Sequence, residues 1–159
     1  MNGALPRIPS EEYPARWRKV QDVLSELKLD MLLAYADDRF TYGAAYARYF
    51  GNLPVAFEPV LLLFAPGEDP RLLVGPETAG YAAEVGSIPE IRVLQEFAAE
   101  SEDYPFARLV PLRSAARECV RGEVRRVGLA GKALMGAELY EAVRAAFPGA
   151  EFIKADVAL

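Results

Sequence analysis

The sequence predicts a single α/β domain with three layers, in which helices flank a mixed, mostly parallel sheet of about five or six strands. Short apolar runs typical of buried strands alternate with segments in which apolar residues recur every three or four positions. Two of these runs are separated only by a turn-rich segment, which predicts one β-hairpin. Residues 1–159 form one unit, because the length suits a single core and no linker or repeat interrupts it.

The first half of the chain predicts two helices, a strand and the hairpin. Ser10 is expected to cap the first helix, where Trp17, Val20, Leu24 and Leu27 recur at helical spacing. The apolar run that follows is typical of a buried strand, and the one-sided aromatic pattern after it predicts a second helix. The expected elements are a helix after Ser10, a strand over 30–36, a helix over 42–50 and a hairpin over 59–64 and 71–74.

The second half predicts three further strands and three further helices around an acidic surface loop over 98–103. Gly86, Gly122 and the Phe147–Pro148–Gly149 sequence end the three helices, because glycine and proline interrupt helical backbone. The expected elements are a helix over 76–86, a strand over 91–94, a helix over 111–122, a strand over 126–130, a helix over 136–147 and a strand over 151–154.

Composition excludes several classes of function. The chain contains no histidine, so any chemistry of its own would have to rest on carboxylates. The 18 basic and 23 acidic residues give a net charge of -5 without a basic cluster, which argues against nucleic acid and anionic membranes as partners. Cys119 is the single cysteine, and no apolar run approaches the length of a membrane span, so we expect a cytoplasmic protein.

Two motifs favour structural over catalytic interpretations. The segment from Gly128 to Ala133 lacks the glycine spacing and the hydroxyl of a phosphate-binding loop, so a tight strand-to-helix turn is expected. Asp37 and Asp38, together with Glu58 and Asp69, have carboxylate oxygens of the kind that bind Mg²⁺ or Ca²⁺. Adjacent Asp side chains, however, point in different directions on extended backbone. We expect the Asp pair to be solvated at the end of the first strand, and we expect no metal ligands.

The aromatic segment over 37–54 supplies the candidate contacts with a small molecule. Its apolar stripe predicts packing on the sheet, whereas Arg39 and Arg48 are planar cations suited to a carboxylate. Tyr49 and Phe50 are candidates for the wall of a shallow substrate pocket. The two interpretations are compatible if opposite faces of the segment have different roles.

The order of these elements resembles the N-terminal domain of the creatinase, prolidase and aminopeptidase P family. The resemblance rests on the helix-to-strand passage over 27–33, the aromatic segment that ends in Tyr49–Phe50–Gly51, the hairpin, and the final passages over 126–131 and 147–153. The family usually has an Asn followed by a Tyr-Leu-Thr-Gly motif after the first strand, and this sequence has Thr41–Tyr42–Gly43 and Tyr49–Phe50–Gly51 instead.

The resemblance implies a ribonuclease H-like fold without catalytic residues. Family members join this domain to a C-terminal metallopeptidase domain of the pita-bread fold, which binds two divalent metal ions (Mn, Co or Zn). The sequence ends at Leu159, where the resemblance places the start of that second domain, so none of its ligands is expected here. The expected partners are this catalytic domain, further copies of the chain, and a small peptide or other small-molecule substrate.

Two hypotheses from different classes follow. The first is a non-catalytic domain of a Xaa-Pro dipeptidase, aminopeptidase P or creatinase-like metallohydrolase, which shapes substrate access and oligomer contacts and is inactive alone. The second is a stand-alone homodimeric module that binds a small carboxylate or peptide through Arg39 or Arg48.

Overall fold

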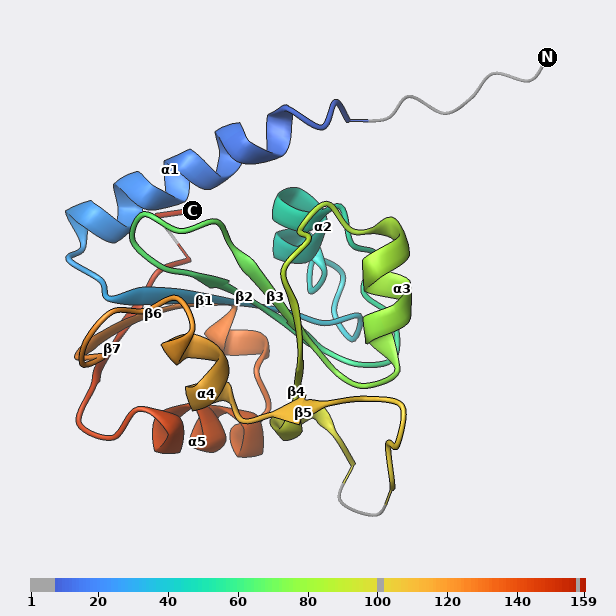
Figure 1. Cartoon of the computed structure of the whole chain (residues 1–159). Helices are drawn as coiled ribbons and strands as arrows, with labels where there is room; N and C mark the ends of the chain where they lie inside the picture. The colour runs from blue at the N-terminus through green and yellow to red at the C-terminus, as the bar shows by residue number, and fades with distance from the viewer. Residues whose placement is uncertain (1–7, 100–101, 157) are drawn as a thin grey trace.

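A seven-stranded sheet between two helical layers forms the body of the molecule (Figure 1). The computed structural model describes residues 8–99, 102–156 and 158–159. The helices are α1 (Glu12–Glu26), α2 (Ala45–Gly51), α3 (Thr78–Val85), α4 (Leu112–Arg117) and α5 (Ala137–Ala146), with 3-10 turns η1 (Gln95–Phe97) and η2 (Lys132–Leu134). The strands are β1 (Met31–Ala36), β2 (Val60–Phe64), β3 (Arg71–Val74), β4 (Ile91–Leu94), β5 (Leu109–Val110), β6 (Arg126–Ala130) and β7 (Glu151–Lys154).

The strand order is β5-β4-β3-β2-β1-β6-β7, and only β2 runs against its neighbours. The predicted mixed, mostly parallel sheet is therefore confirmed, as is the hairpin, in which Leu61 pairs with Leu73. The sheet contains one more strand than the five or six expected. The additional strand is β5, whose two residues are too few to produce a recognisable apolar run.

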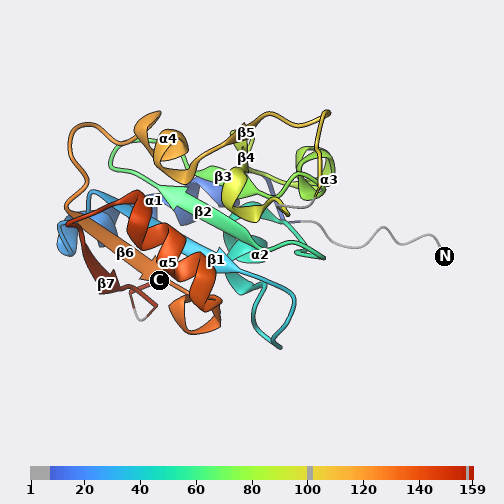
Figure 2. The ribbon, with the colours of Figure 1, turned by 90° about the horizontal axis from the view of Figure 1, so that it is seen from below.

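The two faces of the sheet build two cores, and the alternation along the central strand β1 separates them. Leu32 and Ala34 pack in the core below α1, α2 and α3, whereas Leu33 and Tyr35 pack in the core against α4 and α5. All six residues of β1 are buried, because both faces of the strand are covered. Figure 1 shows the two helical layers, and Figure 2 shows α5 over β6 and β1.

Several helix boundaries differ from the sequence prediction, among them three that change the interpretation of a residue or segment. Glu11, not Ser10, occupies the N-cap position of α1, and its side chain makes no capping hydrogen bond. The second helix begins at Ala45, because the residues before it form turns rather than a helical repeat. The fourth ends at Arg117, five residues before the expected stop at Gly122. No helix within the described ranges is long and apolar enough to cross a membrane.

Gly131 forms the tight turn predicted after β6. Its φ of 75° lies in the left-handed region, and a Cβ there would approach the Tyr35 backbone oxygen to 2.6 Å. The Gly131 amide donates a hydrogen bond of 2.7 Å to Oδ1 of Asp156, which follows β7. The glycine therefore lets the end of β6 pass directly beside β1.

Two helix N-termini are capped by carboxylates from distant segments. Glu58 accepts a hydrogen bond of 2.8 Å from the Thr78 amide at the start of α3. The Glu96 oxygens accept bonds of 2.8 and 3.0 Å from the Leu112 amide at the start of α4. Both carboxylates satisfy donors that a helix leaves free at its first turn. Glu58, which the sequence offered as a metal-binding oxygen, is thus a capping group.

Candidate functional site

The loops at the carboxyl ends of β1 and β6 meet the loop that precedes β2. Because β2 is antiparallel to β1, its amino end lies at the same edge of the sheet. The order of the strands also reverses here, since the chain leaves β1 on the β2 side and returns on the β6 side. Open α/β sheets bind ligands in the crevice outside such a point.

Asp37 lies at the centre of this edge in a buried polar cluster. Its Oδ2 accepts hydrogen bonds from the Tyr35 hydroxyl at 3.0 Å and from Nε and Nη2 of Arg39 at 2.9 and 2.8 Å. Asp37 is 2% exposed, so the expectation of a solvated side chain is wrong. The Asp37 charge is instead balanced by Arg39, two residues later. The loop also packs closely on Asp37, because a Cβ at Gly43 would lie only 2.5 Å from Oδ1.

The cluster changes the acidity of two of its members. Burial, followed by the hydrogen bond and the charge of Asp37, raises the pKa of Tyr35 to about 12. The hydrogen bond with Asp37 raises the pKa of Arg39 further above its ordinary value. Tyr35 therefore stays a neutral donor and Arg39 a cation at physiological pH.

Arg39 also faces a cavity of about 480 Å³ at this edge. Its Nη2 donates to the backbone oxygen of Leu134 at 3.3 Å, which joins the loop after β1 to the turn after β6. Its Nη1 has no hydrogen-bond partner within the described part of the chain, and its side chain is 57% exposed. Tyr35, Phe57 and Phe97 supply aromatic wall to the same cavity.

Three large aromatic side chains are exposed on the two loops that border this edge. Phe40 and Tyr42 lie on the loop after β1, and Phe57 lies on the loop before β2; their exposed fractions are 55%, 83% and 92%. The Phe57 amide donates a hydrogen bond of 3.3 Å to Oδ2 of Asp38, so the two loops are in contact. We call Arg39, Phe40, Tyr42 and Phe57 the carboxyl-edge surface.

The remaining predicted contact residues lie on α2, away from Arg39. The Tyr49 ring lies 4.5 Å from the Arg16 guanidinium, and the Tyr49 backbone oxygen accepts a hydrogen bond of 2.6 Å from Arg16. Phe50 is buried against Phe64, with ring centroids 5.1 Å apart. Arg48 is exposed and forms no side-chain hydrogen bond or ion pair with another described residue.

Tyr49 and Phe50 therefore fix α2 against α1 and the sheet, and only Arg39 of the four residues borders the 480 Å³ cavity. Sequence reasoning did not identify Tyr35 and Phe57 as part of the site. The signal for Tyr35 is its spacing, because Tyr35, Asp37 and Arg39 alternate at the end of a strand. Phe57 has no comparable local signal.

Metal-binding groups do not gather in the described ranges. There, no three Asp, Glu or Cys side chains lie close enough together to hold a metal ion. The acidic groups at the carboxyl edge already accept hydrogen bonds, from Arg39 at Asp37 and from helix amides at Glu58 and Glu96. The described residues therefore do not fit a two-metal centre.

The chain is an α/β domain with a mixed sheet and a cavity at the carboxyl edge of that sheet. Comparisons with known proteins identify its family. The model of the creatinase/prolidase N-terminal domain family matches residues 16–159. The chain therefore belongs to the creatinase/prolidase N-terminal domain family. A comparison with curated protein sequences gives no match.

Solved structures show the same fold at low sequence identity. A proline dipeptidase structure from Streptococcus pneumoniae has a TM-score of 0.63 and 16% identity, covering 89% of this chain and 92% of that chain. Dipeptidase PepE from Mycobacterium ulcerans gives 0.65 and 12%, covering 97% and 37%. The prolidase from Pyrococcus furiosus gives 0.59 and 12%, covering 89% and 35%. This chain thus spans little more than a third of the last two proteins.

Proposed function

We propose that this domain is the non-catalytic N-terminal part of a Xaa-Pro dipeptidase, aminopeptidase P or creatinase-like metallohydrolase, and that its carboxyl-edge surface borders the substrate entrance. The observation that carries the proposal is the exposure of Phe40, Tyr42 and Phe57 on two touching loops. Exposed aromatic side chains gathered beside a cavity are typical of a contact surface rather than of free solvent-facing loops.

The groups at this edge suit recognition of a peptide more than chemistry on it. Nη1 of Arg39 can donate to a substrate carboxylate while Asp37 holds the rest of the guanidinium in place. Phe57 offers an apolar face to a proline ring or another apolar side chain. The bond-breaking step, with two divalent metal ions (Mn, Co or Zn), then belongs to the catalytic domain that is the partner of this one.

Copies of the chain are further proposed partners, as the family resemblance implies. Among the described residues, α2 exposes Arg48 and Tyr49, which do not line the cavity beside Arg39, and these residues are the candidates for such a contact. The buried Cys119, whose pKa is raised by burial, is compatible with our placement of the protein in the cytoplasm.

The first experiment tests the absence of catalysis. The purified 159-residue chain is incubated with Mn²⁺ or Co²⁺ and Xaa-Pro dipeptides, and released proline is measured. We expect no release above that of a buffer blank, because no described cluster of side chains holds a metal ion. Turnover that scales with the concentration of the chain would overturn the proposal.

The second experiment tests the substrate entrance in a protein that carries this domain together with its catalytic partner. Phe57→Ser removes the most exposed aromatic side chain of the carboxyl-edge surface. Loss of about 1 kcal/mol of apolar contact corresponds to a roughly fivefold increase in KM for Xaa-Pro dipeptides. Tyr81→Ser, which removes an exposed aromatic ring from α3, is the matched control. Equal KM values for Phe57→Ser and Tyr81→Ser would contradict the assignment.

A further inference from the structure

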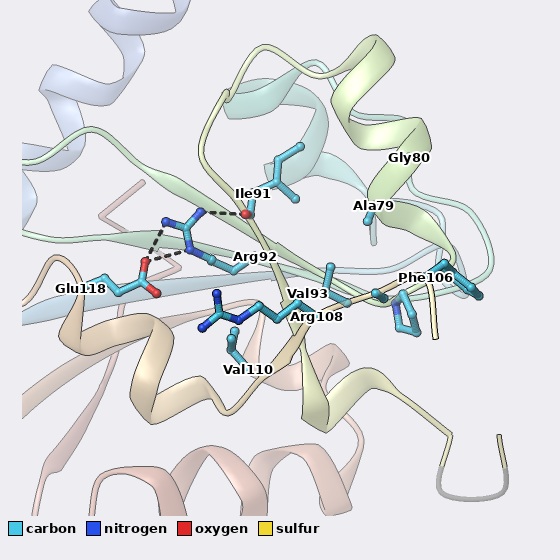
Figure 3. Close-up of a pocket in the computed structure, with 11 residues that line it drawn as sticks. Ala79, Gly80, Ile91, Arg92, Val93, Phe106, Arg108, Val110 and Glu118 are labelled. Atoms are coloured by element: carbon cyan, nitrogen blue, oxygen red, sulfur yellow. Dashed lines mark hydrogen bonds and ion pairs between the residues drawn. The ribbon is translucent and has the colours of Figure 1, made fainter. Parts of the chain in front are cut away.

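A second cavity, of about 670 Å³, lies at the β5 edge of the sheet and is independent of the carboxyl-edge surface. Figure 3 shows it between α3 and the two outermost strands. Small apolar groups from three elements form most of its wall, and the exposed ring of Phe106 lies at one end. The apolar wall consists of Ala79 and Gly80 on α3, Ile91 and Val93 on β4, and Val110 on β5.

The cavity exists because β5 covers only part of β4. The two strands pair at Val93 and Leu94, so the outer side of Ile91 has no strand beside it. The Ile91 backbone oxygen instead accepts a hydrogen bond of 2.8 Å from Nη1 of Arg92. The chain before β5 turns away, and this leaves a half-enclosed space with backbone, apolar and cationic walls.

The charges around this space are paired except at Arg108. Glu118 binds the Arg92 guanidinium through Nε at 2.8 Å and Nη2 at 2.7 Å, and it also pairs with Arg71 at 2.7 Å. The hydrogen bond from Arg92 lowers the pKa of Glu118, so this carboxylate is ionised at neutral pH. Arg92 also pairs with Glu90 at 3.3 Å, so two carboxylates balance these two arginines.

Arg108 is the second cation in the cavity wall, and its charge has no partner among the described residues. It is exposed and forms no hydrogen bond or ion pair with another described residue. Figure 3 shows its side chain extending from the start of β5 toward the Arg92–Glu118 pair. A guanidinium that makes no hydrogen bond to the described residues, beside an apolar wall, is suited to one carboxylate group.

We propose that this cavity binds small amphipathic monocarboxylates. The carboxylate lies on the guanidinium of Arg108 with Arg92 beside it, and the apolar body lies against Ile91, Val93 and the Ala79–Gly80 turn of α3. The volume of about 670 Å³ is within the range of small-molecule sites. The charge of Arg108 selects against amines of the same shape, and the apolar wall selects against short acids such as acetate.

The test is a titration of the ¹⁵N-labelled chain with 4-phenylbutanoate, followed by two-dimensional amide NMR. We expect saturable shifts at the amides of α3, β4 and β5. At equal concentrations, 4-phenylbutylamine and acetate are expected to bind about tenfold more weakly or worse, since each lacks one half of the recognised chemistry. An absence of saturable shifts, or equal binding of the amine, overturns the proposal.

Two variants locate the site, and a third serves as a control. Arg108→Gln removes the free charge and is expected to weaken 4-phenylbutanoate binding about tenfold. Gly80→Leu adds a side chain to the cavity wall at a position where a Cβ meets no atom within 4 Å, and it is expected to narrow the cavity and weaken binding. Arg18→Gln removes an exposed arginine on α1 and is expected to bind as the wild type does. Wild-type affinity in both Arg108→Gln and Gly80→Leu overturns the proposal.

Discussion

The buried Asp37 depends on two neighbours for its charge and its hydrogen bonds. Tyr35 and Arg39 donate to the same oxygen, Oδ2, and the cluster lies where the loop after β1 turns back. A buried charge is tolerated when it is paired and hydrogen-bonded, and it becomes costly when one partner is removed. The buried hydrogen bonds of Asp37 thus hold Arg39 of the carboxyl-edge surface in place.

Tyr35→Phe tests this network through its pH dependence. The variant is expected to lose about 1.5–3 kcal/mol of unfolding free energy at pH 8, because a buried charged acceptor loses its hydroxyl donor. The pKa of Tyr35 is about 12 in the folded chain and 10.0 as its ordinary value. A raised tyrosine pKa stabilises the fold fully below about pH 10, and the effect disappears as pH rises through about 12.

The difference between wild type and Tyr35→Phe should therefore shrink when urea unfolding is followed from pH 8 to pH 11. Tyr42→Phe, which changes a tyrosine that is 83% exposed, controls for titration of the other tyrosines. A constant difference across this pH range would show that the Tyr35 hydroxyl contributes nothing through its protonation state.

At the scale of elements, the N-termini of α3 and α4 are capped by carboxylates from other segments of the chain. Glu58 precedes β2 and Glu96 follows β4, so each helix gains its N-terminal partner only when the sheet is formed. Neither helix has a capping side chain of its own. The short helices of this domain are therefore held by tertiary hydrogen bonds more than by local sequence.

Glu96→Ala is expected to lower the unfolding free energy by about 1 kcal/mol, because the Leu112 amide loses its acceptor at the start of α4. Glu96→Gln retains one oxygen and should lose about half as much, mainly the interaction of charge with the helix dipole. Chemical denaturation measures both. Glu84→Ala on the exposed side of α3 is the control, with a change within about 0.5 kcal/mol. If all three variants unfold alike, the capping role is wrong.

At the scale of the whole molecule, stability is concentrated at the centre of the sheet. The strand β1 is buried on both faces and pairs with β2 and β6, whereas β5 is a two-residue edge strand. Backbone hydrogen bonds that are buried on every side open only in global unfolding, and those at an edge open locally.

Amide hydrogen exchange should therefore rank the strands from the centre outward. The amides of Leu32, Leu33 and Ala34 are expected to exchange at the rate of global unfolding, and those of Leu109 and Val110 orders of magnitude faster. Exchange followed by NMR under native conditions gives both rates on one sample. Similar protection in β1 and β5 would contradict a stability centred on β1.

Most of the sheet could be predicted from the sequence, because buried strands such as β1 and β2 are continuous apolar runs. The short β5 could not, since Leu109 and Val110 pair with β4 only through contacts distant in sequence. The predicted helix over 111–122 extended too far for a related reason. Its apolar spacing continues to Val120, although the helix ends at Arg117 and the following residues turn back to the core.

The candidate site was harder to predict from the sequence than the fold. The sequence predicts a one-sided helical pattern for the aromatic segment, which places Tyr42 and Phe50 on one face. In the structure Tyr42 precedes α2 and is exposed, whereas Phe50 is buried. Which aromatic side chain faces solvent depends on where the helix begins, and no capping residue marks that position. The cavity beside Arg39 combines four segments that are distant in sequence, namely the end of β1 with its loop, the loop before β2, η1 and α5, so no local pattern encodes it.

The position of β1 between β2 and β6 also matters during synthesis on the ribosome. The strand β1 ends at Ala36, but its partner β6 begins at Arg126. At the usual rates of translation the intervening residues take roughly 5 to 20 seconds to emerge, and during that time one edge of an apolar strand is unpaired. A nascent chain at this stage can pair with another copy. We therefore expect chaperone engagement, and aggregation on truncation, to be greatest before β6 is made.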